Sequence, residues 1–198
     1  MIAKLKKALT AILLPLALVA CATSSPPARF YTLQALVTPV EKESVDFGDQ
    51  WVGIGPVRVP TYLDRPQIVT RGDVHRLQIH EFDRWADRVG DRILIVLMEN
   101  VVRLSNSKRV APYPWPSAFR PDRRVVGEVL AFEADASGGV VLRTRWIVHV
   151  PGAPNEGDVQ VSEYMENATA GDFDSITAAM SRALQRWSVD IAQALAVD

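Results

Sequence analysis

A single cysteine, Cys21, occurs among the 198 residues, so the chain can form no internal disulfide. Exported proteins without disulfides must obtain their stability from a hydrophobic core, and about 170 residues are enough for one. After residue 20 there is also no apolar run approaching the roughly 20 residues that a membrane-spanning helix needs. The sequence therefore predicts one self-sufficient domain.

An excess of positive charge is missing as well. The full chain has 22 basic and 23 acidic residues, and three of the basic residues are the lysines at positions 4, 6 and 7. The chain from residue 21 onward, without these lysines, has a net charge of about −4. Such a balance argues against nucleic acid as a partner.

Motifs for catalysis are also lacking. No glycine precedes a lysine, which excludes a phosphate-binding P-loop, and there is no G-x-S-x-G serine elbow. His80 and Glu81 begin a zinc-protease pattern, but Arg84 replaces the second histidine. His75, His80 and His149 either gather on a metal or are ordinary surface and strand histidines, and the second interpretation is favoured. We therefore expect no enzyme activity, no cofactor and no metal.

The first 20 residues have the pattern of a lipoprotein signal peptide. A lysine-containing start precedes an apolar run over residues 8–20, which is too short and too interrupted by Pro15 for a comfortable membrane span. The run ends in Leu18, Val19 and Ala20 immediately before Cys21. This lipobox predicts cleavage before Cys21 and lipid attachment to its thiol, which also accounts for the unpaired cysteine.

The segment that follows predicts a tether and a location. Residues 21–28 are small, polar and proline-bearing, and eight extended residues reach roughly 27 Å. Residue 22 is alanine and not the aspartate that favours inner-membrane retention in the enterobacterial sorting rule. We therefore expect the domain of residues 29–198 to be anchored to the periplasmic face of the outer membrane.

Periodicity predicts an α+β domain, with a mostly antiparallel sheet and two main helices. Strands are expected at residues 29–36, 50–59, 67–71, 74–80, 124–133, 140–150 and 158–167, and helices at residues 91–104 and from Phe173 onward. Gly72 and Asp73 are expected to form a hairpin turn that directs Leu77 and Ile79 to the core. Asp172 or Asp174 is expected to cap the last helix.

Two segments carry candidate interaction residues. The aromatic residues Tyr113 and Trp115 stand between prolines in an irregular segment, so they either pack at the domain edge or contact a partner. Tyr62, Leu63, Asp64 and Arg65 lie between Pro60 and Pro66, a pattern typical of a fixed turn. That turn serves either the domain's own packing or an interface.

The alternating charges at residues 83–92 favour a different interpretation. Asp83, Asp87 and Asp91 are each followed by an arginine, at positions 84, 88 and 92, which is typical of an i,i+4-style ladder of ion pairs in a solvated segment. No acid–base chemistry is expected there.

Several segments together resemble one family. These are the lipobox, residues 30–33 (FYTL), residues 54–69 (IGPVRVPTYLDRPQIV), Trp85 and residues 179–184 (AMSRAL). In this order they resemble the ABC-type transport auxiliary lipoproteins, the PqiC group, over nearly the whole mature chain. The segment at residues 54–69 is the most specific of them.

The resemblance implies a function by protein contact. It implies an accessory subunit of an envelope lipid-transport system, with an integral inner-membrane subunit and a periplasm-bridging MCE-domain protein as partners, and with self-association into a homo-oligomer. It favours an interface at residues 62–65. Two alternatives remain: an outer-membrane assembly or barrel-plug lipoprotein, and, less favoured, an envelope enzyme or metal-binding lipoprotein.

Overall fold

The computed structural model describes residues 25–35, 45–105, 107–152 and 157–196. The predicted signal peptide, its lipobox and Cys21 lie outside these residues and stay predictions, whereas the end of the tether, residues 25–28, is described and exposed. In chain order the elements are β1 (Arg29–Tyr31), β2 (Val52–Arg58), β3 (Gln67–Asp73), β4 (Arg76–Trp85), α2 (Val89–Ser105), β5 (Val110–Pro112), β6 (Arg123–Ala134), β7 (Gly139–His149), β8 (Gln160–Asn167) and α3 (Phe173–Ala196).

Two sheets divide the strands between them. The larger has the order β5-β2-β6-β7-β8, and the smaller has the order β1-β4-β3. The longer pairings β3–β4, β6–β7 and β7–β8 are antiparallel, while β1–β4, β2–β5 and β2–β6 are parallel. The predicted α+β class with two helices is therefore confirmed, and the sheets are mixed.

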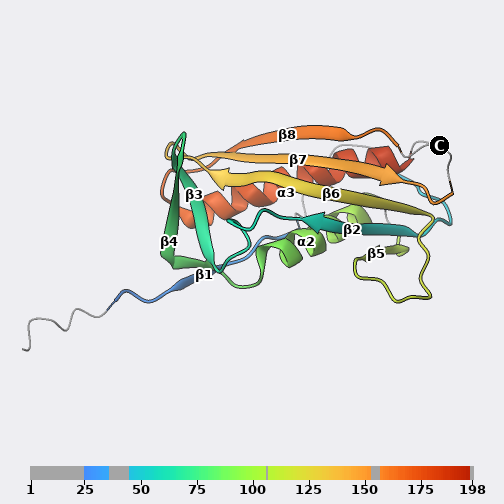
Figure 1. Ribbon diagram of the computed structural model, residues 1–198, viewed down its shortest axis with the longest axis horizontal. Helices are drawn as coiled ribbons and strands as arrows, with labels where there is room; N and C mark the ends of the chain where they lie inside the picture. Colours follow the sequence, from blue (N-terminus) through green and yellow to red (C-terminus); the bar gives the residue numbers. More distant parts are fainter. Residues whose placement is uncertain (1–24, 36–44, 106, 153–156, 197–198) are drawn as a thin grey trace, which may run out of the picture.

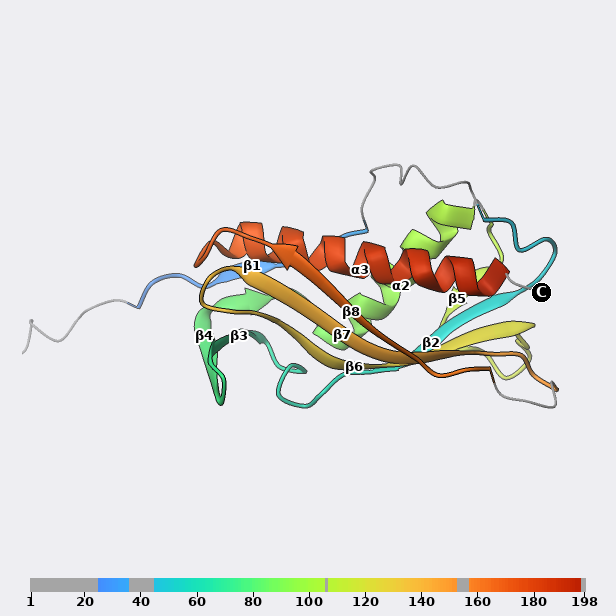
Figure 2. The same cartoon turned by 90° about the horizontal axis from the view of Figure 1, so that it is seen from above.

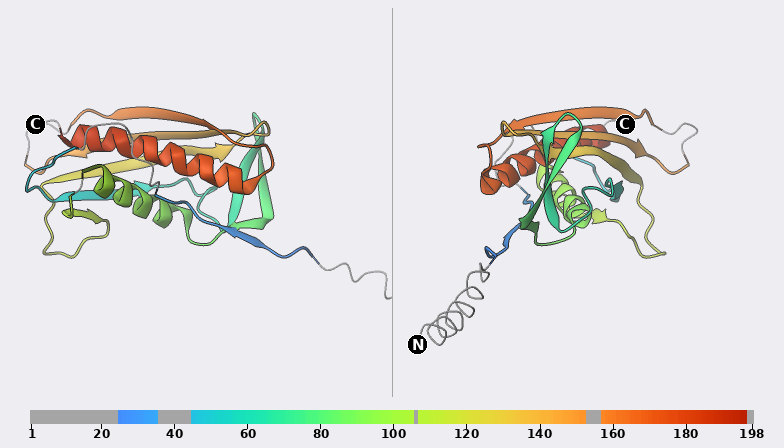
Figure 3. Two further views of the ribbon diagram at one scale, coloured as in Figure 1. Left: turned by 180° about the vertical axis from the view of Figure 1, so that it is seen from behind. Right: turned by 60° about the vertical axis from the view of Figure 1, so that its left-hand side comes forward.

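Both helices cover the same face of the larger sheet (Figure 2). Viewed from behind, α3 runs along β6, β7 and β8, and α2 lies beside it over β2 (Figure 3). The smaller sheet stands at one end of this two-layer body, next to the start of α3 (Figure 1). The tether enters β1 at that same end.

The core between the helices and the larger sheet explains why these elements form. In α2, Ile93, Leu97 and Val101 recur at helical spacing and are fully buried, as the sequence predicts. In α3, the fully buried Trp187 lies against Gly127 of β6, where a Cβ atom would lie only 3.2 Å from the indole ring. A larger residue at position 127 would therefore force the helix away from the sheet.

One buried polar contact joins the two helices. Asn100 Nδ2 of α2 donates a hydrogen bond of 3.1 Å to Ser188 Oγ of α3, and both side chains are buried. A buried amide needs such a partner, because leaving it without one costs about 1–3 kcal/mol. The contact therefore favours one register of α2 against α3.

The first hairpin differs from the prediction in two ways. Asp73 pairs with Arg76, so the strand continues through Gly72 and the turn falls on Val74 and His75. Leu77 and Ile79 are exposed, not in the core. The reason is that side chains alternate between the two faces of a strand, and on this strand it is His80 that packs inward, with its ring 4.6 Å from that of Phe173.

The segment predicted to be irregular contains a short strand. β5 pairs in parallel with the start of β2 and ends at Pro112. It lies at the edge of the larger sheet, where a proline that cannot donate a hydrogen bond is tolerated. The predicted strand at residues 29–36 is also shorter, since β1 ends at Tyr31.

Candidate interaction site

The turn at residues 60–66, which we call the proline-framed turn, links β2 to β3. The backbone N–H groups of Leu63 and Asp64 both donate to the Pro60 carbonyl, at 2.9 and 3.2 Å. At the other end, the Pro66 carbonyl accepts a 2.7 Å bond from the Trp85 N–H of β4. Because proline also fixes φ at both ends, the turn is rigid before any partner binds.

The first half of this turn, Tyr62 and Leu63, packs inside the domain. Leu63 is buried in the core, and the Tyr62 hydroxyl donates a 2.7 Å hydrogen bond to Glu133 Oε2 of β6. Burial, together with this bond to a carboxylate, raises the pKa of Tyr62 well above its ordinary value, so the phenol stays protonated and remains a donor. Of the two interpretations of Tyr62, the structure places its side chain in internal packing.

Glu133 connects the turn to the smaller sheet. Its side chain is buried, and its Oε1 accepts from Nε of Arg71 on β3 at 2.9 Å and also from Nη2 of the same guanidinium. The hydrogen bond to Glu133 raises the pKa of Arg71 further. A buried carboxylate requires a partner of this kind, and here it has both a cation and a phenol.

The other half of the turn faces solvent and forms a groove. Asp64 Oδ2 accepts from Arg88 Nη2 at 2.7 Å, and Arg65 Nε donates to Gln67 Oε1 at 3.2 Å. The groove between them has a volume of about 520 Å³. It is lined by Asp64, Arg65, Pro66, Trp85, Ala86, Asp87 and Arg88, and we call it the Arg65 groove. Its mixture of one tryptophan and opposite charges suits a protein surface better than a small apolar ligand.

The second candidate segment lies elsewhere, against β2. Trp115 donates from its indole N–H to the Ala111 carbonyl at 3.1 Å, and its ring fills the space beside Gly53, where a Cβ atom would clash. Its ring also contacts Tyr113 and Phe119, with centroids 5.4 and 6.0 Å apart. Trp115 therefore packs at the domain edge, whereas Tyr113 remains exposed.

The segment at residues 83–92 forms ion pairs as predicted, but not in the predicted i,i+4 pattern. Residues 83–85 belong to β4, Arg84 pairs with Glu81 three residues before it, and three other charged side chains of the segment reach distant parts of the chain. Asp83 accepts from Arg29, Arg88 donates to Asp64, and Arg92 Nε donates to the Leu33 carbonyl at 2.7 Å. Regular spacing in sequence was misleading because the chain changes from strand to helix in the middle of the pattern.

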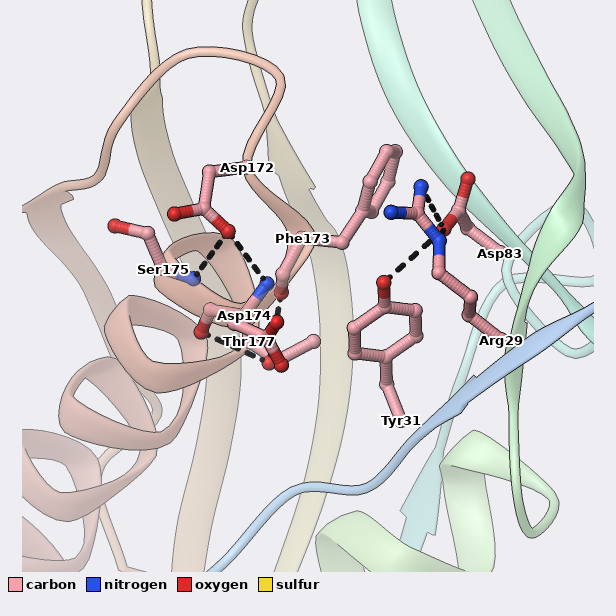
Figure 4. Close-up of polar contacts among 8 residues, drawn as sticks. All are labelled: Arg29, Tyr31, Asp83, Asp172, Phe173, Asp174, Ser175 and Thr177. Carbon is pink, nitrogen blue, oxygen red and sulfur yellow. Dashed lines mark hydrogen bonds and ion pairs between the residues drawn. The ribbon is translucent and has the colours of Figure 1, made fainter.

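A polar cluster that the sequence did not reveal fastens β1 (Figure 4). The buried Asp83 Oδ1 accepts from Arg29 Nε at 2.8 Å and from the Tyr31 hydroxyl at 3.1 Å. Burial and the Asp83 contact raise the pKa of Tyr31. The Tyr31 ring lies 5.9 Å from that of Phe173, so the strand that follows the tether is tied to both β4 and α3. No local pattern points to Asp83, because its partners Arg29 and Tyr31 lie more than 50 residues away in the sequence.

The three histidines occupy the β3–β4 hairpin and the end of β7. His80 lies on β4, with its Nε2 2.8 Å from Thr70 Oγ1, while His75 occupies the exposed turn and His149 ends β7. Within the described ranges, no three His, Cys, Asp or Glu side chains are grouped as a metal site requires. Among the helices of the described chain, none has both the length and the hydropathy to cross a bilayer.

Comparison with known proteins gives the fold and the family. A crystal structure of an uncharacterized protein superposes with a TM-score of 0.69 at 17% identity, covering 85% of this chain and 98% of that one. A protein from Xanthomonas campestris gives 0.70 at 16% identity, covering 83% and 93%. The chain matches no curated protein. A family model described as ABC-type transport auxiliary lipoprotein component matches residues 31–192.

Proposed function

Because the chain belongs to the ABC-type transport auxiliary lipoprotein family, we propose that it is a lipid-anchored accessory subunit of an MCE-type envelope lipid-transport system. The observation that carries the proposal is the family match over residues 31–192, which includes every strand and helix apart from the first two residues of β1 and the last four of α3. Membership of this family associates the chain with transporter subunits.

The proposed partners follow from the same family. They are a periplasm-bridging MCE-domain protein, an integral inner-membrane subunit and further copies of this chain. The proposed location is the periplasmic face of the outer membrane, with Cys21 as the lipid attachment site. We propose that the subunit acts by contact and performs no chemistry.

The Arg65 groove is the surface that we propose for one of these contacts. Its backbone is held by Pro60 and Pro66, so little entropy is lost when a partner binds. Arg65 and Trp85 are residue types that often contribute strongly to binding at interfaces. Tyr62 and Leu63 pack inside the domain and do not line this groove. The exposed Tyr113 is a second, separate candidate.

Charge reversal at the groove tests this proposal. Arg65→Glu is expected to lower capture of the MCE-domain protein from detergent-solubilised envelopes about tenfold, because an interfacial arginine contributes on the order of 1–2 kcal/mol. Arg145→Glu on β7 is the control, since it also reverses an exposed, hydrogen-bonded arginine, and its side chain points away from the buried Thr144 and Trp146 on the helix-covered face of the sheet. Mass spectrometry of the captured proteins is the measurement.

The outcomes separate the alternatives. Equal capture by wild type and Arg65→Glu would remove the groove from the interface. Capture of an outer-membrane β-barrel protein in place of an MCE-domain protein would support the assembly or barrel-plug function and overturn the transport proposal.

A further inference from the structure

The smaller sheet exposes an unusual number of large apolar side chains. Phe30 of β1 is 66% exposed, and Leu77, Ile79 and Phe82 of β4 are 37, 47 and 38% exposed. Isolated apolar residues on a surface need no explanation, but a group of them on one small sheet marks a contact surface. We call these four residues the apolar patch.

The four side chains share the outer face of the sheet. His80 and Asp83 point inward, because His80 packs on Phe173 and Asp83 bonds the Tyr31 hydroxyl. Regular alternation would place these two side chains on opposite faces, since they are three residues apart, but the pairing of β4 is irregular between them: Ile68 pairs with His80, whereas the adjacent Gln67 pairs with Arg84. On each side of this irregularity neighbouring side chains point to opposite faces, so Ile79, next to His80, and Phe82, next to Asp83, both point outward. The same alternation places Leu77 with Ile79. It also directs Phe30 away from its neighbours Arg29 and Tyr31, which both bond Asp83.

The covalent chain limits how far this face can lie from the lipid anchor. Arg29 follows Cys21 by eight residues, a reach of at most roughly 27 Å even when fully extended. Phe30, a member of the apolar patch, is the next residue. The tether also joins the molecule at the end where the smaller sheet stands (Figure 1).

We propose that the apolar patch docks on the surface of the lipid bilayer that holds the anchor, so that the smaller sheet lies against the membrane. The proposal rests on lipidation of Cys21, which is part of the proposed function. A tethered apolar face meets the bilayer at a high local concentration, and each side chain that enters the interface gains apolar burial.

The margin of the patch fits a membrane surface. Arg84 of β4 pairs with Phe30 of β1, so its side chain, which also bonds Glu81, lies on the same face as Phe30 and can meet lipid phosphates while the apolar side chains enter the acyl boundary. Docking would place the end of the body that carries the smaller sheet against the membrane. The Arg65 groove would then lie next to the lipid surface, and α3 would extend from its N-terminus away from the membrane.

Site-specific fluorescence on the full lipidated protein tests the docking. Since lipid occupies the thiol of Cys21, a cysteine introduced by Ile79→Cys is the only reactive one and takes an NBD label. Phe82→Cys is a second labelling site. Val161→Cys on β8 is the matched control, because Val161 is 67% exposed and lies on the other sheet. The protein is reconstituted in vesicles of phosphatidylethanolamine and phosphatidylglycerol.

Docking is expected to shift the emission at positions 79 and 82 to the blue and to make quenching by doxyl-labelled lipid several-fold stronger than at position 161. Equal quenching at all three positions in lipidated protein would overturn the docking alone. Self-quenching at position 79 that depends on protein density and not on doxyl lipid would assign the patch to a second copy and also overturn it. Mature protein without the added lipid mass would overturn the anchoring and the docking together.

Discussion

At the scale of single residues, His80 shows how an inward position changes a side chain's chemistry. Its ring lies against Phe173 and next to the Thr70 hydroxyl, and burial lowers its pKa, although Asp83 acts in the opposite direction. The neutral imidazole is therefore the form that the folded domain accommodates.

The consequence is a pH-dependent stability with a definite sign. The unfolded histidine has a pKa of about 6.5 and the folded one a lower value, so the unfolded chain binds more protons as pH falls through this range. The contribution of His80 to the free energy of unfolding is fully present above pH 6.5 and is lost as pH falls toward the folded pKa. Urea unfolding across this range is expected to show a shallower loss of stability in His80→Gln than in wild type.

The control for this prediction is the exposed His75. His75→Gln should keep the wild-type slope, since its side chain lies in the turn between β3 and β4. If His80→Gln keeps the slope as well, another group carries the pH dependence.

At the scale of elements, α3 begins at a side-chain cap that the sequence predicts. Asp172 Oδ1 accepts from the backbone N–H groups of Asp174 and Ser175, at 3.0 and 3.3 Å (Figure 4). These are among the first N–H groups of the helix, which have no partner within the helix itself. Asp172→Ala is expected to lower the free energy of unfolding by about 1 kcal/mol and the melting temperature by roughly 2–4 °C.

Asp172→Asn is the matched variant, because an asparagine oxygen caps nearly as well. Calorimetry of both variants separates the cap from general effects of losing an acid. A melting temperature that falls equally in both would point to the charge and not to the hydrogen bonds.

The elements also show what the sequence can and cannot predict. The helices and the β6–β7 hairpin follow from local patterns, namely the stripes of Ile93 and Trp187 and the turn residues 135–139. The parallel pairing of β2 with β6 depends on contacts between distant segments, which no local pattern records. For the same reason the proline-framed turn could be predicted from the sequence, whereas the hydrogen bond of its Tyr62 to Glu133 could not. The prediction that Ile79 faces the core was wrong.

At the scale of the whole molecule, the anchor is expected to decide where the domain works. Cys21→Ser should block lipid attachment and maturation, so that the protein incorporates no labelled palmitate and leaves the outer-membrane fraction. A single acyl chain binds membranes only marginally, which is why the fully modified cysteine matters. Gradient fractionation of envelopes with palmitate labelling measures both effects.

Ala22→Asp provides the matched control for location. It should remain lipidated, and by the enterobacterial sorting rule it should move to the inner membrane. A Cys21→Ser protein that still carries labelled palmitate and still fractionates with the outer membrane would contradict the predicted lipidation site.

The parallel pairing of β2 with β6 also has a consequence for the order of folding. Val52 of β2 pairs with Arg123 of β6 and with Val110 of β5, so β2 has no strand partner until much later chain has emerged. Pairings between such distant segments form slowly, since a long loop must close first, whereas β6, β7 and β8 form a local meander. We expect this C-terminal meander to nucleate the fold. The N-terminal half, although it is made first, would then be the last part to be protected from unfolding and the part that depends most on holdase chaperones.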